Sequence, residues 1–158
     1  MNIVLFEPGE LAQPLPLADR RSQHVLGVLR RGPGDRFAAG VIDGPRGLAT
    51  IESIAEDGLL LRFEATDEPP PLEPICVLVG LPRPQTARKV LQEATSLGVS
   101  ELHFFISQRG DLAYAQSPLW RDEWRRHVIA GAEQAFTTRL PRVTAGGSLR
   151  QTLAGLPR

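Results

Sequence analysis

The chain has 158 residues, of which 42% are hydrophobic and 23% charged, with a formal net charge of zero, which suits one ordinary domain or two small ones. No stretch approaches the roughly 18 apolar residues that span a membrane, and the start MNIVLFEPGE lacks the basic residues and long apolar core of a signal peptide. These features exclude membrane-spanning and secreted classes and predict a soluble, cytoplasmic protein with no membrane partner.

The first half of the chain is rich in β-prone runs. They are separated by the turn sequences GPGD, DGPRG and EDG and lie at 3–6, 35–43, 47–54 and 59–65. Short runs at this spacing predict a small antiparallel barrel or sheet. One helix is expected at 21–31, with an apolar stripe formed by Val25, Leu26, Val28 and Leu29.

A small basic patch follows this helix. Arg30 and Arg31 precede the GPGD turn, in a half that otherwise has 11 acidic residues against 7 arginines. They are candidate RNA-binding residues, although a two-residue patch is weak support for nucleic-acid binding by itself. His24 lies beside the apolar stripe and is expected to pack rather than to bind a ligand.

A proline-rich segment, EATDEPPPLEP at 64–74, marks a boundary, because its four prolines fit neither a helix nor a central strand. Beyond it, strand-like and helix-like runs alternate in the order 75–81, 85–98, 101–107, 117–136 and 140–145, with a last helix opened by Ser148. This alternation predicts a parallel, Rossmann-like α/β sheet. The second half is also the more basic, with 11 Arg and Lys residues against 7 acidic ones.

Two arginines follow strands of this predicted sheet. Arg83 comes after the strand at 75–81 and just before a helix, and Arg109 comes shortly after the strand at 101–107. Ligands of open α/β sheets bind at the carboxyl ends of the strands, and free N–H groups at helix starts favour anions. If the strands are parallel, both arginines lie on one rim, where they can hold a phosphate or remain solvated.

Two polar residues lie on the predicted helices. Gln92 lies on the polar arc of the helix at 85–98, which a solvated face explains. Glu133 lies between Ile129 and Phe136, so it is expected to be partly buried. A carboxylate in that position near an arginine is more often a structural ion pair than a catalytic base.

The single cysteine, Cys76, lies in the apolar run ICVLVG and is expected to be a small core residue. No group of Cys and His residues has metal-ligand spacing, so no metal site is expected. The long helix has residues at four-residue intervals that predict a packing face rather than a base-stacking surface: Trp120, Trp124, Val128, Ala132 and Phe136.

Four segments carry a resemblance to a known family: HVLGVLRRGPGDRF, VIDGPRGLATIESI, LQEATSLGVSELHFFISQR and GAEQAFTTRLP. Their order and spacing, from His24 to Pro141, resemble RsmE-type enzymes, the SPOUT-class methyltransferases that make 3-methyluridine in small-subunit ribosomal RNA. The resemblance implies a two-domain α+β protein. Its parts are a PUA-like, RNA-binding β-barrel at 1–68, a proline-rich linker at 69–74, and the N-terminal part of a Rossmann-like SPOUT domain at 75–158.

The resemblance also implies partners and site residues. The methyl donor of the family is S-adenosylmethionine, the partner is ribosomal RNA or the small ribosomal subunit, and the complete enzyme is a homodimer. Matched by position, the residues implied in RNA binding are Arg30, Arg83, Gln92, Arg109, Glu133, Gln134 and Arg139. The sequence departs from the family pattern at Glu93, Ser96 and Thr137, which indicates a divergent branch.

The family's knot segment, with its Gly-Pro-Glu-Gly-Gly-type loop, is not among the 158 residues. The resemblance therefore implies a fold truncated before the trefoil knot, no donor-binding residue, no identifiable catalytic base and no methyl transfer by this chain alone. Two other functions stay open. One is a non-catalytic RNA-binding module derived from the family, and the other is a small phosphate-binding α/β enzyme that uses Arg83 and Arg109.

Overall fold

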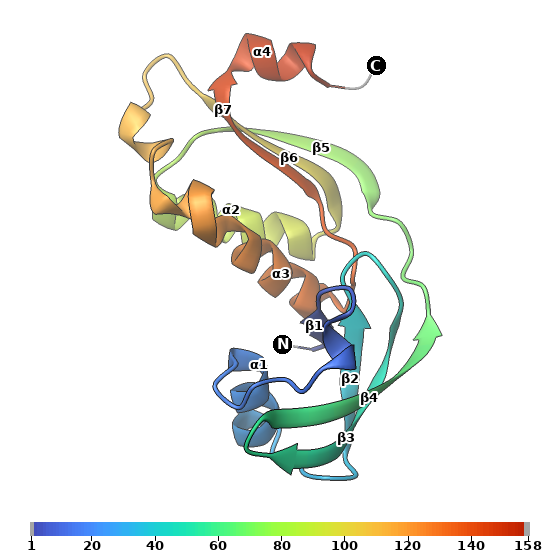
Figure 1. Ribbon diagram of the computed structural model, residues 1–158. Helices are drawn as coiled ribbons and strands as arrows, with labels where there is room; N and C mark the ends of the chain where they lie inside the picture. The colour runs from blue at the N-terminus through green and yellow to red at the C-terminus, as the bar shows by residue number, and fades with distance from the viewer. Residues whose placement is uncertain (1, 157–158) are drawn as a thin grey trace. The chain divides into compact units, whose positions relative to one another are not determined.

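The computed structural model describes residues 2–156 and divides the chain into two compact units (Figure 1). The first unit contains the chain up to Pro70 together with Phe136–Arg139, and the second contains Pro71–Ala135 and the chain from Leu140 onward. The boundary at Pro70 falls inside the predicted linker. Every helix within residues 2–156 is too short or too polar to cross a membrane.

The first unit is built on one four-stranded sheet. Its strands, in spatial order, are β1 (Val4–Phe6), β2 (Arg36–Val41), β3 (Arg46–Ala55) and β4 (Gly58–Asp67). Strand β1 runs parallel to β2, and the other pairs are antiparallel. All four predicted β runs are therefore confirmed as strands, while the strand pairs of the described residues form a sheet and do not close into a barrel.

The alternation of side chains along these strands builds the core of the first unit. In β3, Ala49 and Ile51 are buried while Glu52 is exposed, as a sheet with one covered face requires. The cluster also contains Phe6 from β1 and Leu59 from β4.

The backbone at the start of β4 lies close to the backbone of Leu15. Gly58 has φ +141°, and a Cβ at this position would lie 2.2 Å from the carbonyl oxygen of Leu15. Only glycine fits here, because any side chain would meet both the strained backbone and this carbonyl group.

The predicted helix at 21–31 is present in a shorter, irregular form. It consists of α1 (Arg20–Gln23) and a π-helical turn, η2 (His24–Val28), and a 3-10 turn, η1 (Glu10–Ala12), precedes it. Val25 is fully buried but Val28 is 68% exposed, so the expected apolar stripe is narrower than predicted. The wider π turn changes the angular spacing of successive side chains and turns Val28 away from the core.

The side chain of Arg21 bonds to several segments at the start of the first unit. Its guanidinium donates to Glu10 Oε2 at 2.7 Å, to Asp19 Oδ2 at 2.7 Å and to the carbonyl oxygen of Leu5 at 3.2 Å. It also lies over the ring of Phe6, 5.0 Å from the ring centroid. Hydrogen bonds from Arg21 hold the pKa values of the Glu10 and Asp19 carboxyl groups below their ordinary values of 4.5 and 3.8.

Replacing Arg21 with alanine is expected to lower the free energy of unfolding of the first unit by about 2 kcal/mol at neutral pH, because charge-assisted hydrogen bonds are lost. Carboxyl groups with depressed pKa values stabilise the fold above their ordinary pKa values and lose this effect as the pH falls. The gap between wild type and variant should therefore shrink between about pH 6 and pH 3 in urea denaturation. A gap that is independent of pH would contradict the proposed ion pairs, and Arg31→Ala should change stability by less than about 0.5 kcal/mol.

The second unit has a parallel three-stranded sheet in the order β5-β6-β7. Its strands are β5 (Glu73–Gly80), β6 (Val99–Ile106) and β7 (Arg142–Ser148), and both strand pairs are parallel. Its helices and helical turns are α2 (Pro84–Ser96), η3 (Leu112–Tyr114), η4 (Leu119–Glu123), α3 (Trp124–Ala135) and α4 (Leu149–Ala154). The predicted strand–helix alternation is thus confirmed.

The start of β5 differs from the prediction. The strand begins at Glu73 rather than at 75, so the last two residues of the predicted linker, Glu73 and Pro74, belong to the sheet. Proline is tolerated there because β5 lies at the edge of the sheet, where a missing N–H group breaks no ladder.

Helices α2 and α3 pack together and bury one face of the sheet. The core of the second unit contains Leu91 from α2, Val128 from α3, and Leu102 and Phe104 from β6. Trp120 packs against Phe104 with ring centroids 4.7 Å apart, and Trp124 also contacts this core. The tryptophans therefore have the packing role that the sequence predicts, and in this fold they are not free to stack on bases.

The predicted packing face of the long helix ends earlier than expected. Phe136 has φ +57° and is 41% exposed. It belongs to the first unit, where its ring lies 5.5 Å from the Arg46 guanidinium and its carbonyl oxygen accepts a hydrogen bond from Arg46. The helix stops at Ala135, and the next four residues join the other unit.

The prediction that Cys76 is a core residue is wrong, because the structure places it at the surface. Side chains alternate along β5, so Val77 and Val79 pack towards the helices while Cys76 points to the opposite face. The prediction rested on the apolar neighbours of Cys76, and such a run is typical of parallel sheets that are covered on both faces. Here both α2 and α3 contribute to the core on one face.

Candidate nucleic-acid interface

Apart from Arg20 and Arg125, the arginine side chains of the described residues fall into two groups. One group is paired with carboxylates: Arg21, Arg36, Arg46, Arg62, Arg88, Arg126 and Arg139. In residues 2–156, no ion pair or hydrogen bond fixes the side chains of the second group: Arg30, Arg31, Arg83, Arg109, Arg121, Arg142 and Arg150. Guanidinium groups of the second group keep all their N–H donors available for a phosphate.

Three of these free arginines follow the three strands of the second unit. Strands β5, β6 and β7 are parallel and end at Gly80, Ile106 and Ser148, so their carboxyl ends share one edge of the sheet. The residues that follow these ends are Arg83, Arg109 and Arg150 in turn. We call these three residues the rim arginines. The prediction that the strands before Arg83 and Arg109 are parallel and end at one edge of the sheet is confirmed.

Each rim arginine has a different local setting. Arg83 is the residue that precedes the first turn of α2, where Pro84 starts the helix, and its side chain is exposed. Arg109 lies in the loop after β6, and Arg150 lies in the first turn of α4, whose start is capped by Ser148. Exposed positions at strand and helix ends leave these long side chains free to adapt to a ligand.

An open pocket of about 630 Å³ lies at the same edge. It is lined by the ends of β6 and β7 and by the residues that follow them: Phe105, Ile106, Ser107, Gln108, Arg109, Ser148, Leu149 and Arg150. The lining residues include two arginines, two serines and no acidic residue, beside the apolar side chains of Phe105, Ile106 and Leu149. The arginines can pair with an anionic group such as a phosphate, and the apolar side chains can contact the rest of a ligand. Arg83 is not part of the lining.

Sequence reasoning did not single out Arg150, although a usable pattern was present. An arginine follows each of the three predicted strands within a few residues. In the structure Ile106 is opposite Ser148, so Arg109 comes three residues after the end of β6 and Arg150 two residues after the end of the neighbouring β7.

Four other predicted site residues do not lie on this rim. Gln92 is exposed on α2, Gln134 is exposed near the end of α3, and Glu133 is 3% exposed within α3. Arg139 donates to the carbonyl oxygen of Asp43 at 2.9 Å and pairs with Glu68 at 3.3 Å within the first unit. These contacts give Arg139 a structural role, and the part of all four in RNA binding stays a prediction.

The remaining two predicted residues, Arg30 and Arg31, are exposed in the first unit. Arg30 has φ +53° and follows the helical segment that ends at Leu29. Arg31 lines a small pocket of about 190 Å³ together with Leu29 and Phe37. The basic patch predicted from the sequence is therefore present as two exposed arginines.

Comparison with known proteins places the second unit in a family. The sequence pattern of the RNA methyltransferase domain matches residues 68–158, more than half of the chain. The chain belongs to the RNA methyltransferase domain family. The curated relatives agree with the RsmE-type resemblance. The chain is 36% identical over 155 residues to ribosomal RNA small subunit methyltransferase E of Treponema pallidum, and 25% identical over 154 residues to ribosomal RNA small subunit methyltransferase E 1 of Borreliella burgdorferi.

These matches cover nearly all of this chain but only part of the family members. They cover 95% and 97% of this chain, and 58% and 65% of the Treponema and Borreliella proteins. The fold is also similar to a crystal structure of ribosomal RNA small subunit methyltransferase E from Neisseria gonorrhoeae bound to S-adenosyl methionine. That likeness has a TM-score of 0.68 at 24% identity and covers 98% of this chain and 66% of the Neisseria protein.

The pocket at the sheet edge does not fit the methyl donor found in the Neisseria structure. S-adenosylmethionine has a sulfonium and an ammonium group against one carboxylate, so it is cationic overall. Two arginines and no acidic residue line the pocket, so the charge of this site opposes the donor and favours an anion. We therefore derive no methyl-transfer step through this pocket.

Proposed function

We propose that this chain provides RNA binding to a ribosomal RNA small-subunit methyltransferase whose complete form methylates N3 of a uridine. The first unit takes the role of the family's PUA-like RNA-binding barrel, with Arg30 and Arg31 as phosphate contacts. The second unit contributes the rim arginines to the same RNA. The complete enzyme is proposed to act as a homodimer.

The observation that supports this proposal best is the rim itself. Arg83, Arg109 and Arg150 follow three adjacent parallel strands, and within residues 2–156 none of their side chains is neutralised by a carboxylate. Several other exposed arginines are paired with carboxylates, for example Arg36 with Glu64 at 2.6 Å. Unpaired guanidinium groups that gather at a ligand-binding edge favour a polyanion, and an RNA backbone supplies phosphates at regular intervals.

In the complete enzyme, S-adenosylmethionine would supply the methyl group that is transferred to N3 of the uridine. The residues described here bind and orient the RNA for this step. The pocket at the sheet edge contributes no carboxylate, histidine or lysine side chain that could take the N3 proton.

A small phosphate-binding enzyme is the second candidate, since the pocket formed by Arg109 and Arg150 has room for a compact ligand. The two functions differ in which part of the chain they need. An enzyme that binds one small phosphate ester needs the pocket alone. RNA binding also needs Arg83, which lies outside the pocket lining, and the two arginines of the first unit.

Binding measurements test the proposal directly. The chain is expected to bind a fluorescent small-subunit ribosomal RNA fragment in anisotropy titrations, with affinity that falls as salt rises. Calorimetric titration with S-adenosylmethionine is expected to show no binding to this chain. Absence of RNA binding at low salt would reject the proposal. Donor binding by the chain would contradict the division of roles, and competition of RNA by millimolar inorganic phosphate alone would favour the small-ligand enzyme.

A further inference from the structure

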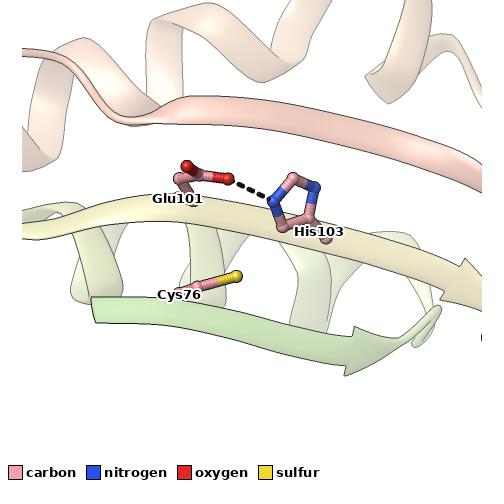
Figure 2. Close-up of side chains that lie close together, drawn as sticks. All are labelled: Cys76, Glu101 and His103. Atoms are coloured by element: carbon pink, nitrogen blue, oxygen red, sulfur yellow. Dashed lines mark hydrogen bonds and ion pairs between the residues drawn. The ribbon is translucent and has the colours of Figure 1, made fainter. Parts of the chain in front are cut away.

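Three potential metal ligands meet on the face of the second unit's sheet opposite α2 and α3. Cys76 on β5 lies directly beside Glu101 on β6, because the two residues are partners in the parallel strand pair. His103 lies two residues further along β6 on the same face (Figure 2). The thiol sulfur, a carboxylate oxygen and a ring nitrogen all lie within 4.8 Å of one another.

The exposure of these side chains decreases from the thiol to the imidazole. Cys76 is exposed, the side chain of Glu101 is 21% exposed, and that of His103 is 6% exposed. An ion among them would have protein ligands on its inner side and solvent on the side of the thiol. This arrangement resembles zinc sites that have three protein ligands and an open fourth position.

His103 is held in an orientation that metal-binding histidines commonly have. Its Nδ1 lies 2.7 Å from the hydroxyl oxygen of Thr144 on β7, and its Nε2 lies 2.7 Å from Glu101 Oε2. The Thr144 hydroxyl can accept a hydrogen bond from Nδ1, which leaves the Nε2 lone pair directed at the carboxylate. Two electron-rich atoms at that distance need a proton or a cation between them, and a hydrogen bond from the second ring nitrogen is the usual support of a metal-bound histidine.

The charges around the cluster also favour a cation. Glu101 and a Cys76 thiolate would both be anionic. The nearest arginine in the strand register, Arg142, is opposite Glu101 on β7. Within residues 2–156, Arg142 forms no ion pair with this carboxylate. The cluster therefore offers sulfur, oxygen and nitrogen donors, and Glu101 has the His103 imidazole as its ion-pair partner when that ring is protonated.

We propose that Cys76, Glu101 and His103 bind one divalent cation of the zinc class, and that the ion fastens β5 to β6 on the face of the sheet opposite α2 and α3. Mixed sulfur, nitrogen and oxygen donors suit zinc and its transition-metal neighbours rather than magnesium or calcium, which prefer oxygen alone. Tetrahedral zinc places its ligand atoms about 3.5 Å apart. The three atoms reach this geometry when Glu101 and His103 separate slightly and the cysteine side chain moves inwards.

Cobalt titration tests this site, because a thiolate bound to Co²⁺ gives a strong near-ultraviolet charge-transfer band. Cys76 is the only cysteine of the chain, so such a band can report on no other thiol. We expect the band to saturate at one ion per chain and to disappear when Zn²⁺ is added. Zinc should also raise the melting temperature of the wild type and leave that of Cys76→Ser unchanged.

Variants separate this site from non-specific metal binding. Glu101→Gln and His103→Ala are expected to weaken Co²⁺ binding at least 100-fold. Thr144→Val, which removes only the partner of the histidine ring, should weaken it about 10- to 100-fold. His127→Ala is the matched control and should bind like the wild type. Because Glu101 reaches the surface, Glu101→Gln still tests the site if His103→Ala fails to fold.

Two results would overturn the proposal. One is the absence of a thiolate band with excess Co²⁺ in the reduced wild-type chain. The other is a band that saturates at one ion per two chains and is unaffected by His103→Ala, which would assign the metal to thiols of two chains.

Discussion

The variant Gly131→Ala is expected to lower the free energy of unfolding of the second unit by about 3 kcal/mol. Alanine normally stabilises a helix by about 1 kcal/mol relative to glycine, so the expected sign is opposite to the intrinsic preference. A Cβ at Gly131 in α3 would lie 2.3 Å from the carbonyl oxygen of Gln92 and 2.8 Å from Cβ of Thr95, both in α2. A backbone carbonyl cannot move aside as a flexible side chain can, so the helices must separate and the core beneath them loosens.

The hydrogen bond between these helices would also weaken. The hydroxyl of Ser96 donates to the carbonyl oxygen of Gly131 at 3.1 Å, a contact that depends on the same close approach. Urea denaturation followed by tryptophan fluorescence measures the effect, since Trp120 and Trp124 both contact the core of this unit. The melting temperature should fall by more than about 10 °C.

Gly27→Ala is the matched control. Gly27 lies in a helical turn of the first unit, and a Cβ there would have no neighbour within 4 Å. The substitution should be neutral or stabilise by up to about 1 kcal/mol. If Gly131→Ala were as stable as the wild type, the packing of α2 against α3 through a glycine contact would be wrong.

The second large effect is expected on the affinity for RNA. The triple variant Arg83→Ala, Arg109→Ala and Arg150→Ala is expected to bind small-subunit ribosomal RNA about 100-fold more weakly than the wild type at 0.1 M salt, if each arginine neutralises one phosphate. The deficit should shrink as salt approaches about 1 M, because it arises from counterion release. Fluorescence anisotropy with one RNA fragment over a range of salt concentrations measures both effects.

A second triple variant controls for the loss of positive charge. Arg36, Arg62 and Arg126 are exposed but already paired with carboxylates. Changing these three residues to alanine removes the same formal charge, and the affinity should fall less than about threefold, because exposed charges act over roughly 10 Å at this salt. Equal losses in the two triple variants would show that net charge, and not the rim, determines binding.

Much of the fold could be predicted from local patterns. The β-prone runs of the first half are strands, and the helix that ends at Gly98 has φ +80° at that glycine, as a helix stop requires. The alternation in the second half correctly predicted parallel pairing, which in turn placed Arg83 and Arg109 at one sheet edge.

The features that were missed depend on contacts between distant residues. Phe136–Arg139 joins the first unit because Thr138 is buried there and its hydroxyl donates to the carbonyl oxygen of Gly44, 94 residues away. No periodicity within the segment could reveal this contact. Cys76 was placed in the core because an apolar strand does not show whether one or both of its faces are covered.

The cluster of Cys76, Glu101 and His103 could not be predicted for the same reason. Metal-ligand spacing along the sequence describes ligands on one turn or loop, whereas Cys76 and Glu101 are brought together by a strand pair. The expectation that the chain has no metal site rested on that local spacing alone.

The salt dependence of RNA binding tests the central claim most directly. For single-stranded RNA, each phosphate contact contributes about 0.7 to the slope of log affinity against log salt concentration. If the rim arginines bind RNA phosphates, the slope for the triple rim variant should be less steep than that of the wild type by about 2. Parallel lines for wild type and variant would contradict the account, because they would show that Arg83, Arg109 and Arg150 contact no phosphate of the bound RNA.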